Sequence, residues 1–289
     1  TTNNVILEGG GIGVTEDLEA TDPSRRFIAF GPGCYQPSFR NRSCAMAWDR
    51  VSSGGWQPQS LHQDTAYSAD GLVWSHARSI PWPPPQRYDC HNNLVRAPKS
   101  TNGNDDAKAW LATTRDVKNW ASTGRTIGIT ESSATPGEEL SFDTSVAPNV
   151  TLSDTVDSQL YSQITFPWLD VYLGIVMVYD ATDPAGRVHC HLAWALPTDV
   201  TRADGWRWVE ADGVKGRPFI PLGAPGAFDS HICFASKPIS YGGRERVYYF
   251  GGNGPHSGER NSSFALATLR RDGYAGVRAL DERGSFFTR

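Results

Sequence analysis

Short apolar runs separated by turn-forming residues make up most of this sequence. Each run has the length of a β-strand, is rich in β-branched or aromatic residues, and is bounded by Gly, Pro, Asn or Asp. This pattern predicts an all-β protein. The clearest runs are Arg26–Phe30, Asn93–Arg96, Leu160–Phe166, Val171–Tyr179, Val188–Ala195, His231–Ala235, Arg246–Phe250 and Phe264–Leu269.

One segment fits two patterns. Apolar side chains at Ala107, Trp110, Leu111 and Val117 fall at helical spacing, so pattern alone also allows a helix over Ala107–Trp120. We keep this helix as the alternative to a strand at that place.

A turn motif recurs after several of these strands: a small residue, a polar turn with Asp, and then an aromatic residue. Asp-Gly favours a tight hairpin, because Gly accepts a positive φ and Asp hydrogen-bonds the turn backbone. We expect the aromatic residues, among them Trp74, Trp120 and either Trp206 or Trp208, to pack between neighbouring sheets. Sheets repeated around an axis form a β-propeller, and a plain antiparallel sandwich is the alternative. The copies are Ala66–Trp74, Ala112–Trp120, Asp204–Trp208 and Ala267–Tyr274.

Composition narrows the classes of partner and cofactor. The chain has 29 glycines and 19 prolines in 289 residues, which leaves little room for long helices, and its formal net charge is −4. A slightly acidic chain argues against nucleic acid as a partner. Its longest apolar stretch, Val171–Tyr179, is too short for a membrane span. There is no Cys-x-x-Cys and no His at zinc spacing, so we expect neither a metal nor another cofactor.

Several features together favour an extracellular protein. Three N-glycosylation sequons begin at Asn41, Asn149 and Asn261, and the chain has ten Trp, two Met and five Cys. In an oxidising compartment cysteines pair. We expect one disulfide between Cys34 and Cys44, which flank a loop rich in turn residues, and another between Cys190 and Cys233. This pairing leaves Cys90 over, and the sequence alone does not fix the connectivity.

The order of several motifs resembles the five-bladed β-propeller glycosidase superfamily. This group includes the invertase-like family thirty-two and the arabinanase-like family forty-three glycoside hydrolases, and the closest likeness is to an under-characterised branch. The likeness extends from about Asp17 to Ala279. It is carried by Tyr67–Trp74, Asp89–Asn93, Gly226–Asp229, Arg246–Gly252 and Phe264–Ala279.

The resemblance implies one propeller domain over residues 1–289, built from five antiparallel blades of four strands each. We expect Asn4–Leu7 to close the fifth blade by joining strands near the C-terminus. A β-sandwich commonly follows the propeller in such proteins, so we expect the chain to be a fragment that lacks it.

The resemblance also implies three carboxylates at the narrow end of a central funnel, one each from the inner strands of blades one, two and three. Glycoside cleavage needs a protonated acid and an ionised carboxylate with separated pKa values. The candidates are Asp17 for blade one, with Asp22 as a rival, and Asp89 for blade two. For blade three the family has a Glu, but no Glu opens the strand Leu160–Phe166 of this sequence, and Asp157 is the nearest carboxylate.

Residues around these carboxylates are the candidates for binding substrate. His91 and Asn92 follow Asp89 closely, and Tyr161 follows Asp157. Blade four and its loops offer Asp229 and His256. His189 and His191 alternate on a strand and share a face. They have no evident third ligand for a metal, so we expect them to be buried or hydrogen-bonded.

Three functions follow from this likeness. The first is a secreted glycoside hydrolase that acts on a polysaccharide in the central funnel. The second, favoured by the missing Glu, is a propeller without catalysis that serves as a glycan-binding or structural module of an extracellular assembly. The third is a sialidase-like propeller, which would need an arginine cluster that the sequence does not make obvious. The expected partners are a carbohydrate and an additional domain or extracellular protein.

Overall fold

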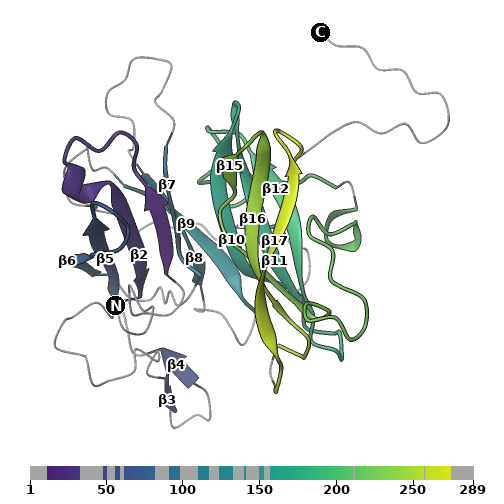
Figure 1. The fold of residues 1–289 in the computed structure, drawn as a ribbon. Coiled ribbons are helices and arrows are strands. Elements are labelled where there is room, and N and C mark those ends of the chain that lie inside the picture. Colours follow the sequence, from purple (N-terminus) through teal and green to yellow (C-terminus); the bar gives the residue numbers. More distant parts are fainter. Residues whose placement is uncertain are drawn as a thin grey trace, which may run out of the picture.

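The computed structural model describes residues 12–32, 48–50, 56–58, 62–81, 91–97, 110–116, 124–132, 140, 150–152, 157–210, 212–256 and 258–274. Over these residues the chain is almost entirely β (Figure 1). The helical elements of the described part are two single turns, η1 (Pro23–Arg25) and η4 (Gly213–Lys215). The prediction of an all-β protein is therefore confirmed.

The N-terminal half of the chain forms three small antiparallel sheets. The first contains β1 (Gly13–Glu16), β2 (Phe27–Pro32), β5 (His62–Ser68) and β6 (Ser75–Pro81), in that order. The second is the hairpin of β3 (Trp48–Arg50) and β4 (Trp56–Pro58). The third contains β7 (Asn93–Arg96), β8 (Trp110–Asp116) and β9 (Thr126–Ser132).

The C-terminal half forms one sheet of eight strands. Its main path runs through β10 (Ser158–Trp168), β11 (Val171–Asp180), β12 (Val188–Ala195), β14 (Ile232–Ala235), β16 (Arg244–Gly252) and β15 (Ile239–Tyr241). Two further strands extend it: β13 (Arg207–Trp208) pairs with β12, and β17 (Ser262–Arg270) pairs with β16.

The eight-stranded sheet has one parallel junction. β12 and β14 run parallel and pair at Val188 and Ile232, whereas the other strand pairs of the sheet are antiparallel. Next to this junction a disulfide joins Cys190 to Cys233, with their Cα atoms 5.8 Å apart. This confirms the predicted pair. The other predicted pair, Cys34 and Cys44, lies outside the described residues.

The number of blades stays a prediction. The first sheet has the four antiparallel strands expected of one blade, but the C-terminal strands are continuous across the parallel junction. Asn4–Leu7, expected to close the fifth blade, lies outside the described residues.

Every apolar run singled out in the sequence lies within or closely overlaps a strand. The helical alternative for Ala107–Trp120 is wrong, because Trp110–Asp116 forms β8. Successive residues Trp110 to Arg115 are all buried, so both faces of this strand are covered. A strand buried on both faces lacks the alternating pattern that distinguishes it from a helix.

Three sheets pack side by side to make the core. Phe30 and Tyr67 of the first sheet pack with Leu94 and Trp110 of the β7–β9 sheet. The other face of that sheet packs against β10 and β11 (Figure 1). These contacts include Leu111, Ile127, Ile129, Tyr172 and Val176. The β7–β9 sheet is therefore the middle layer, between the first sheet and the eight-stranded sheet.

The recurring turn motif forms as predicted between β5 and β6. The Asp70 carboxylate accepts hydrogen bonds from the backbone N–H groups of Leu72 and Val73, at 2.8 and 2.9 Å. Gly71 has a φ of +76°, which glycine adopts without steric cost. In the copy after β17 it is Asp272, not Gly273, that has the positive φ, of 58°. Aspartate tolerates this region better than most residues. In this copy Asp272 therefore takes the positive φ that Gly71 takes in the turn between β5 and β6.

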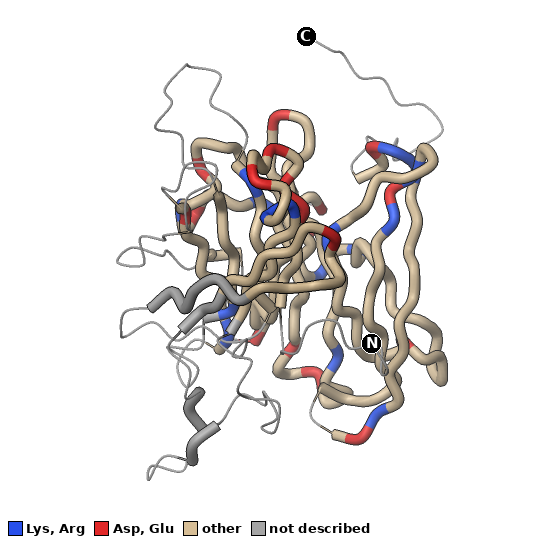
Figure 2. The backbone as a smooth tube through the Cα atoms, turned by 60° about the vertical axis from the view of Figure 1, so that its left-hand side comes forward, with Lys and Arg blue, Asp and Glu red and all other residues tan. Residues whose placement is uncertain are grey.

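Basic and acidic residues are interspersed along the described chain (Figure 2). No helix of the described part is long and apolar enough to cross a membrane.

Candidate functional site

Four rings from distant segments meet at one end of the middle sheet. They are His91, two residues before β7, Tyr161 of β10, Phe234 of β14 and His256, which follows β16; we call them the His–Tyr cluster. The His91 ring stacks on Phe234 with centroids 4.9 Å apart, and it meets the edge of Tyr161 at 5.2 Å. The Tyr161 hydroxyl lies 2.7 Å from His256 Nε2.

Two arginines complete this arrangement. The guanidinium carbons of Arg115 and Arg125 lie 4.3 and 4.9 Å from the centroid of the Tyr161 ring. Both residues are buried, and Arg125 donates a hydrogen bond to the Gln159 side chain at 2.6 Å. A guanidinium within about 6 Å of an aromatic face is attracted by the ring. The cluster therefore combines aromatic rings with strong hydrogen-bond donors.

A buried asparagine aligns the strands that carry the cluster. The Asn93 side-chain oxygen accepts a hydrogen bond from the backbone N–H of Thr165 at 2.9 Å and from the Thr113 hydroxyl at 3.3 Å. These bonds connect β7 to β8 and β10 in one register. His91, two residues before Asn93, contacts Tyr161 of β10.

The backbone at His91 is unusual. Its φ is +65°, in the left-handed region that non-glycine residues seldom adopt. Such a conformation costs on the order of 1 kcal/mol and persists where the surroundings stabilise it. Here the stacking on Phe234 and the contact with Tyr161 provide that stabilisation.

Both histidines of the cluster are uncharged at neutral pH. Burial, and next the positive charge of Arg115, lower the pKa of His91 to about 3. Burial, and next the charge of Arg125, lower the pKa of His256 to about 4. A neutral imidazole has one donor and one acceptor nitrogen. The cluster thus offers both hydrogen-bond types next to apolar ring faces.

The predicted catalytic residue Asp17 lies at the opposite end of β7 from His91. Its carboxylate is buried and makes two hydrogen bonds with the Arg96 guanidinium, at 2.8 and 2.6 Å. Arg96 is the last residue of β7, five residues after His91. At the rise of a strand this corresponds to about 16 Å.

The other two predicted carboxylates are Asp157 and Asp89. Asp157 is exposed and directly precedes β10, where its carbonyl oxygen accepts a hydrogen bond from the N–H of Ala181 at 2.7 Å. Tyr161 contacts His91, and Thr165, further along β10, bonds Asn93 of β7. Asp157 precedes both on the chain, so it lies on the side of the His–Tyr cluster that is away from Asp17. Asp89 lies outside the described residues. A catalytic role for these three carboxylates stays a prediction.

The remaining predicted residues have different surroundings. Asn92 is buried next to His91 in the chain. Asp229 is buried too and accepts a hydrogen bond from the Tyr249 hydroxyl at 2.7 Å. Burial, and next this bond, raise the pKa of Tyr249 to about 12. Three of the predicted binding residues, His91, Tyr161 and His256, are in mutual contact through Tyr161.

Of the predicted glycosylation sites, only Asn261 is described. It is exposed directly before β17. Asn41 and Asn149 lie outside the described residues. No group of three His, Cys, Asp or Glu in the described part of the chain is placed to hold a metal ion.

Sequence reasoning missed Arg115, Arg125 and Phe234. The sequence does contain a signal for Arg115. It directly follows five uncharged residues, Trp110–Thr114, on the same strand. Charged residues are seldom fully buried unless they are paired or functional. Phe234 carries no such signal, since its strand is apolar throughout.

No family model matches this chain, and no curated protein matches it. Among solved structures, an N-acetylgalactosamine deacetylase from F. plautii, in complex with blood group B trisaccharide, is 13% identical with a TM-score of 0.48; the match covers 92% of this chain and 91% of that one. A GH93 α-L-arabinofuranosidase of Fusarium graminearum, in complex with arabinobiose, is 11% identical with a TM-score of 0.48, and covers 92% and 63%.

A GH32 β-fructofuranosidase of Bombyx mori, a mutant in complex with sucrose, is 10% identical with a TM-score of 0.49. The match covers 94% of this chain but 47% of that one, so this chain spans about half of the length of the fructofuranosidase. These structural neighbours are proteins that act on glycans, and each is distant from this chain in sequence.

Proposed function

We propose that this protein binds a carbohydrate at the His–Tyr cluster, as a secreted, glycoside hydrolase-like five-bladed propeller. The observation that carries the proposal is the convergence of Tyr161, Phe234 and two neutral imidazoles from four separate segments of the chain. A sugar ring has apolar C–H faces and a rim of hydroxyl groups. Aromatic faces pack against the C–H faces, and imidazole and phenol groups form hydrogen bonds with the hydroxyl groups.

The positions of the described carboxylates favour binding without hydrolysis over catalysis. Hydrolysis of a glycosidic bond requires two carboxyl groups about 5 to 9.5 Å apart, on either side of the bond. Asp17 is engaged by Arg96 at the far end of β7, and Asp157 lies on the other side of the cluster. Catalysis thus depends on Asp89, which precedes His91 by two residues in the sequence, and on a partner for it.

The test is a binding screen with a panel of plant, algal and microbial polysaccharides by affinity gel electrophoresis. Phe234→Leu keeps an apolar side chain but removes the flat ring, so we expect retardation by the binding polysaccharide to fall strongly. The matched control is Phe264→Leu on β17, where the ring is 81% exposed and in the same eight-stranded sheet. Thermal unfolding of both variants checks that they fold.

The outcomes separate the candidates. If no polysaccharide retards the wild-type protein, or if Phe264→Leu weakens binding as much as Phe234→Leu, the proposed site is wrong. Release of reducing sugar from the bound polysaccharide, abolished by Asp89→Asn while binding persists, would make the protein a hydrolase. Binding without release would make it a binding module.

Secretion is part of the same proposal. Exposure of Asn261 in its sequon and the Cys190–Cys233 disulfide support an extracellular protein. Expression through a eukaryotic secretory pathway, followed by mass spectrometry of Asn261→Gln against wild type, tests whether a glycan is attached there.

A further inference from the structure

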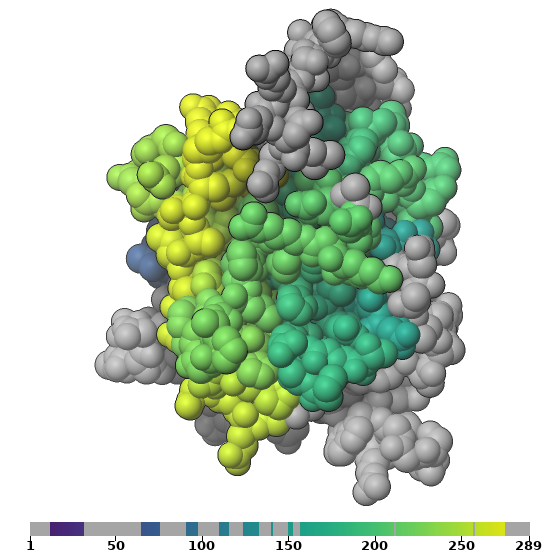
Figure 3. Space-filling model, turned by 90° about the vertical axis from the view of Figure 1, so that its right-hand side faces the viewer, coloured from purple at the N-terminus to yellow at the C-terminus, as the bar shows by residue number. Residues whose placement is uncertain are grey.

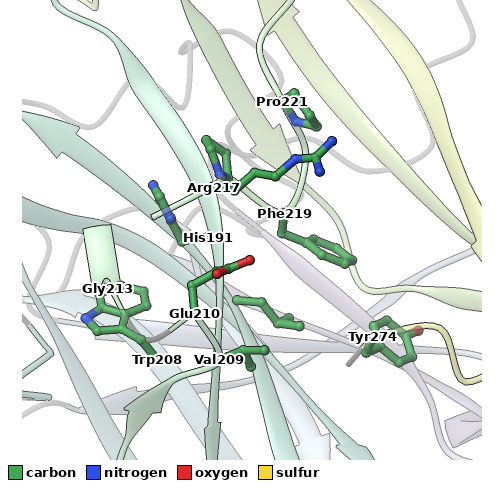
Figure 4. A pocket seen from close by; sticks show the side chains of 11 residues that line it. His191, Trp208, Val209, Glu210, Gly213, Arg217, Phe219, Pro221 and Tyr274 are labelled. Carbon is green, nitrogen blue, oxygen red and sulfur yellow. The ribbon is translucent and has the colours of Figure 1, made fainter. Parts of the chain in front are cut away.

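A pocket lies beside the C-terminal sheet. Its volume is about 260 Å³. The walls are His191 of β12, Trp208 of β13, Phe219 in the connection to β14, and Tyr274 after β17 (Figure 4). In Figure 3 the green connecting segment lies across this face, between the yellow C-terminal strand and the teal strands.

Hydrogen bonds fix the aromatic walls in place. The indole N–H of Trp208 donates to the carbonyl oxygen of Leu152 at 2.8 Å, and the Phe219 N–H donates to the Cys190 carbonyl at 2.8 Å. The Tyr274 hydroxyl donates to Glu245 at 3.1 Å, and its ring lies 6.1 Å from Phe219 at an angle of 29°. The pocket is therefore formed before any ligand arrives, and little ordering is needed for binding.

A glycine lets the chain close over Trp208. Gly213 has a φ of +60°, and a Cβ atom added to it would lie 3.0 Å from the Trp208 ring. Any other residue would strain the backbone and press on the indole. Glu210, Gly213 and Arg217 all line the pocket.

Two charged side chains from this loop line the same pocket. Glu210 and Arg217 are exposed, and neither side chain forms a hydrogen bond or ion pair with the described residues. Figure 4 shows the Glu210 carboxylate among His191, Trp208 and Phe219, and the Arg217 guanidinium near Pro221. The pocket thus offers a carboxylate acceptor and guanidinium donors beside aromatic rings.

We propose that this pocket binds one sugar ring of a glycan, as a second carbohydrate site separate from the His–Tyr cluster. The aromatic rings would contact the C–H face of the sugar, the Glu210 carboxylate would accept from its hydroxyls, and Arg217 would donate to them. A volume below the range of about 300–1,000 Å³ for sites of drug-sized ligands suits a single ring better than an extended chain. The sugar class rests on the proposed function, whereas the place of the site does not.

The experiment follows the indole N–H signals of the ten tryptophans by two-dimensional NMR during titration with methyl pyranosides of glucose, galactose, mannose, xylose and N-acetylglucosamine. Trp208→Phe assigns the Trp208 signal. We expect at least one glycoside to shift this signal. Glu210→Gln and Arg217→Met should each weaken that binding about tenfold or more, because each removes a charge-assisted hydrogen bond.

Matched controls lie on the same loop. Asp212→Asn and Lys215→Met change exposed charges that do not line the pocket, and they should leave the affinity unchanged. The proposal is overturned if no glycoside shifts the Trp208 signal, or if the controls weaken binding as much as the pocket variants do. Phe234→Leu keeps the two proposals apart: it should abolish polysaccharide binding at the cluster and leave the Trp208 titration as in wild type.

Discussion

At the scale of single residues, Asp17 of the predicted carboxylate set forms an ion pair with Arg96. The Asp17 and Arg96 side chains are only 8% and 18% exposed, and their closest atoms are 2.6 Å apart. Arg96 also lies over the Trp110 ring at 4.8 Å. Asp17 therefore has a structural role in joining the first and middle sheets.

Asp17→Asn tests that role. Removing one partner of a largely buried ion pair leaves the other charge uncompensated, so the free energy of unfolding should fall by about 2–4 kcal/mol in urea denaturation. Glu19→Gln is the control, since its exposed carboxylate lies 3.8 Å from Arg96 and should contribute under about 0.5 kcal/mol. An Asp17→Asn variant that is as stable as wild type would contradict the structural role.

His91 predicts how stability depends on pH. Its folded pKa of about 3 is below the ordinary value of 6.5, so the unfolded state takes up a proton first as the pH falls. Its contribution to stability is therefore intact above pH 6.5 and is lost progressively between pH 6.5 and 3. At pH 5.5 the loss is about 1 kcal/mol.

His91→Asn removes this titration while keeping a residue that tolerates a positive φ. The difference in unfolding free energy between pH 7 and pH 5.5 should be about 1 kcal/mol smaller than in wild type, as measured by urea denaturation. A variant with the pH dependence of wild type would show that His91 is not buried in its neutral form.

Part of this residue-level picture could be predicted. The sequence singles out His91 because it follows Asp89 closely, Tyr161 because it lies near Asp157, and His256 because its Gly-rich loop could reach the expected funnel. Nothing local in the sequence shows that Arg96, 79 positions away, faces Asp17. Long-range ion pairs depend on which strands become neighbours, and that depends on tertiary packing.

At the scale of elements, the disulfide joins the two strands that meet in parallel. Cys190 and Cys233 lie beside the Val188–Ile232 bridge, which provides the parallel pairing of β12 with β14. A cross-link over a separation of 43 residues restricts the unfolded chain considerably. It therefore stabilises a junction that has few hydrogen bonds of its own.

Replacing both Cys190 and Cys233 by Ala should lower the free energy of unfolding by about 4 kcal/mol, as loop-closure entropy predicts for this separation. Urea denaturation of the variant measures the loss, and wild type treated with a reductant should show a similar one. Alkylation of native, unreduced protein at both cysteines, detected by mass spectrometry, would contradict the bond.

Strands were predictable where apolar runs are bounded by turn residues, as at Val188–Ala195, which matches β12 residue for residue. The ambiguity at Trp110–Asp116 came from burial on both faces, which removes the alternation of exposed and buried positions. The edge strand β17 shows the opposite, with exposed and half-buried residues alternating along most of its length.

At the scale of the whole molecule, the order of sheets decides what the site can do. The β7–β9 sheet lies between the first sheet and the eight-stranded sheet, and the ends of β7 and β10 bring His91 and Tyr161 together. The all-β class could be predicted from the turn-rich sequence. The continuity of β12 with β14 could not, because parallel pairing between strands about 40 residues apart leaves no local signal.

The central claim is that a carbohydrate binds at the His–Tyr cluster. The most direct measurement is isothermal titration calorimetry of wild type and Tyr161→Phe with an oligosaccharide fragment of the polysaccharide bound most tightly in the screen. Tyr161→Phe removes only the hydroxyl that contacts His256, and Tyr248→Phe, 45% exposed on β16, is the matched control. Tyr161→Phe should weaken binding about tenfold, and Tyr248→Phe should leave the affinity unchanged. Equal affinity of wild type and Tyr161→Phe would contradict carbohydrate binding at the His–Tyr cluster.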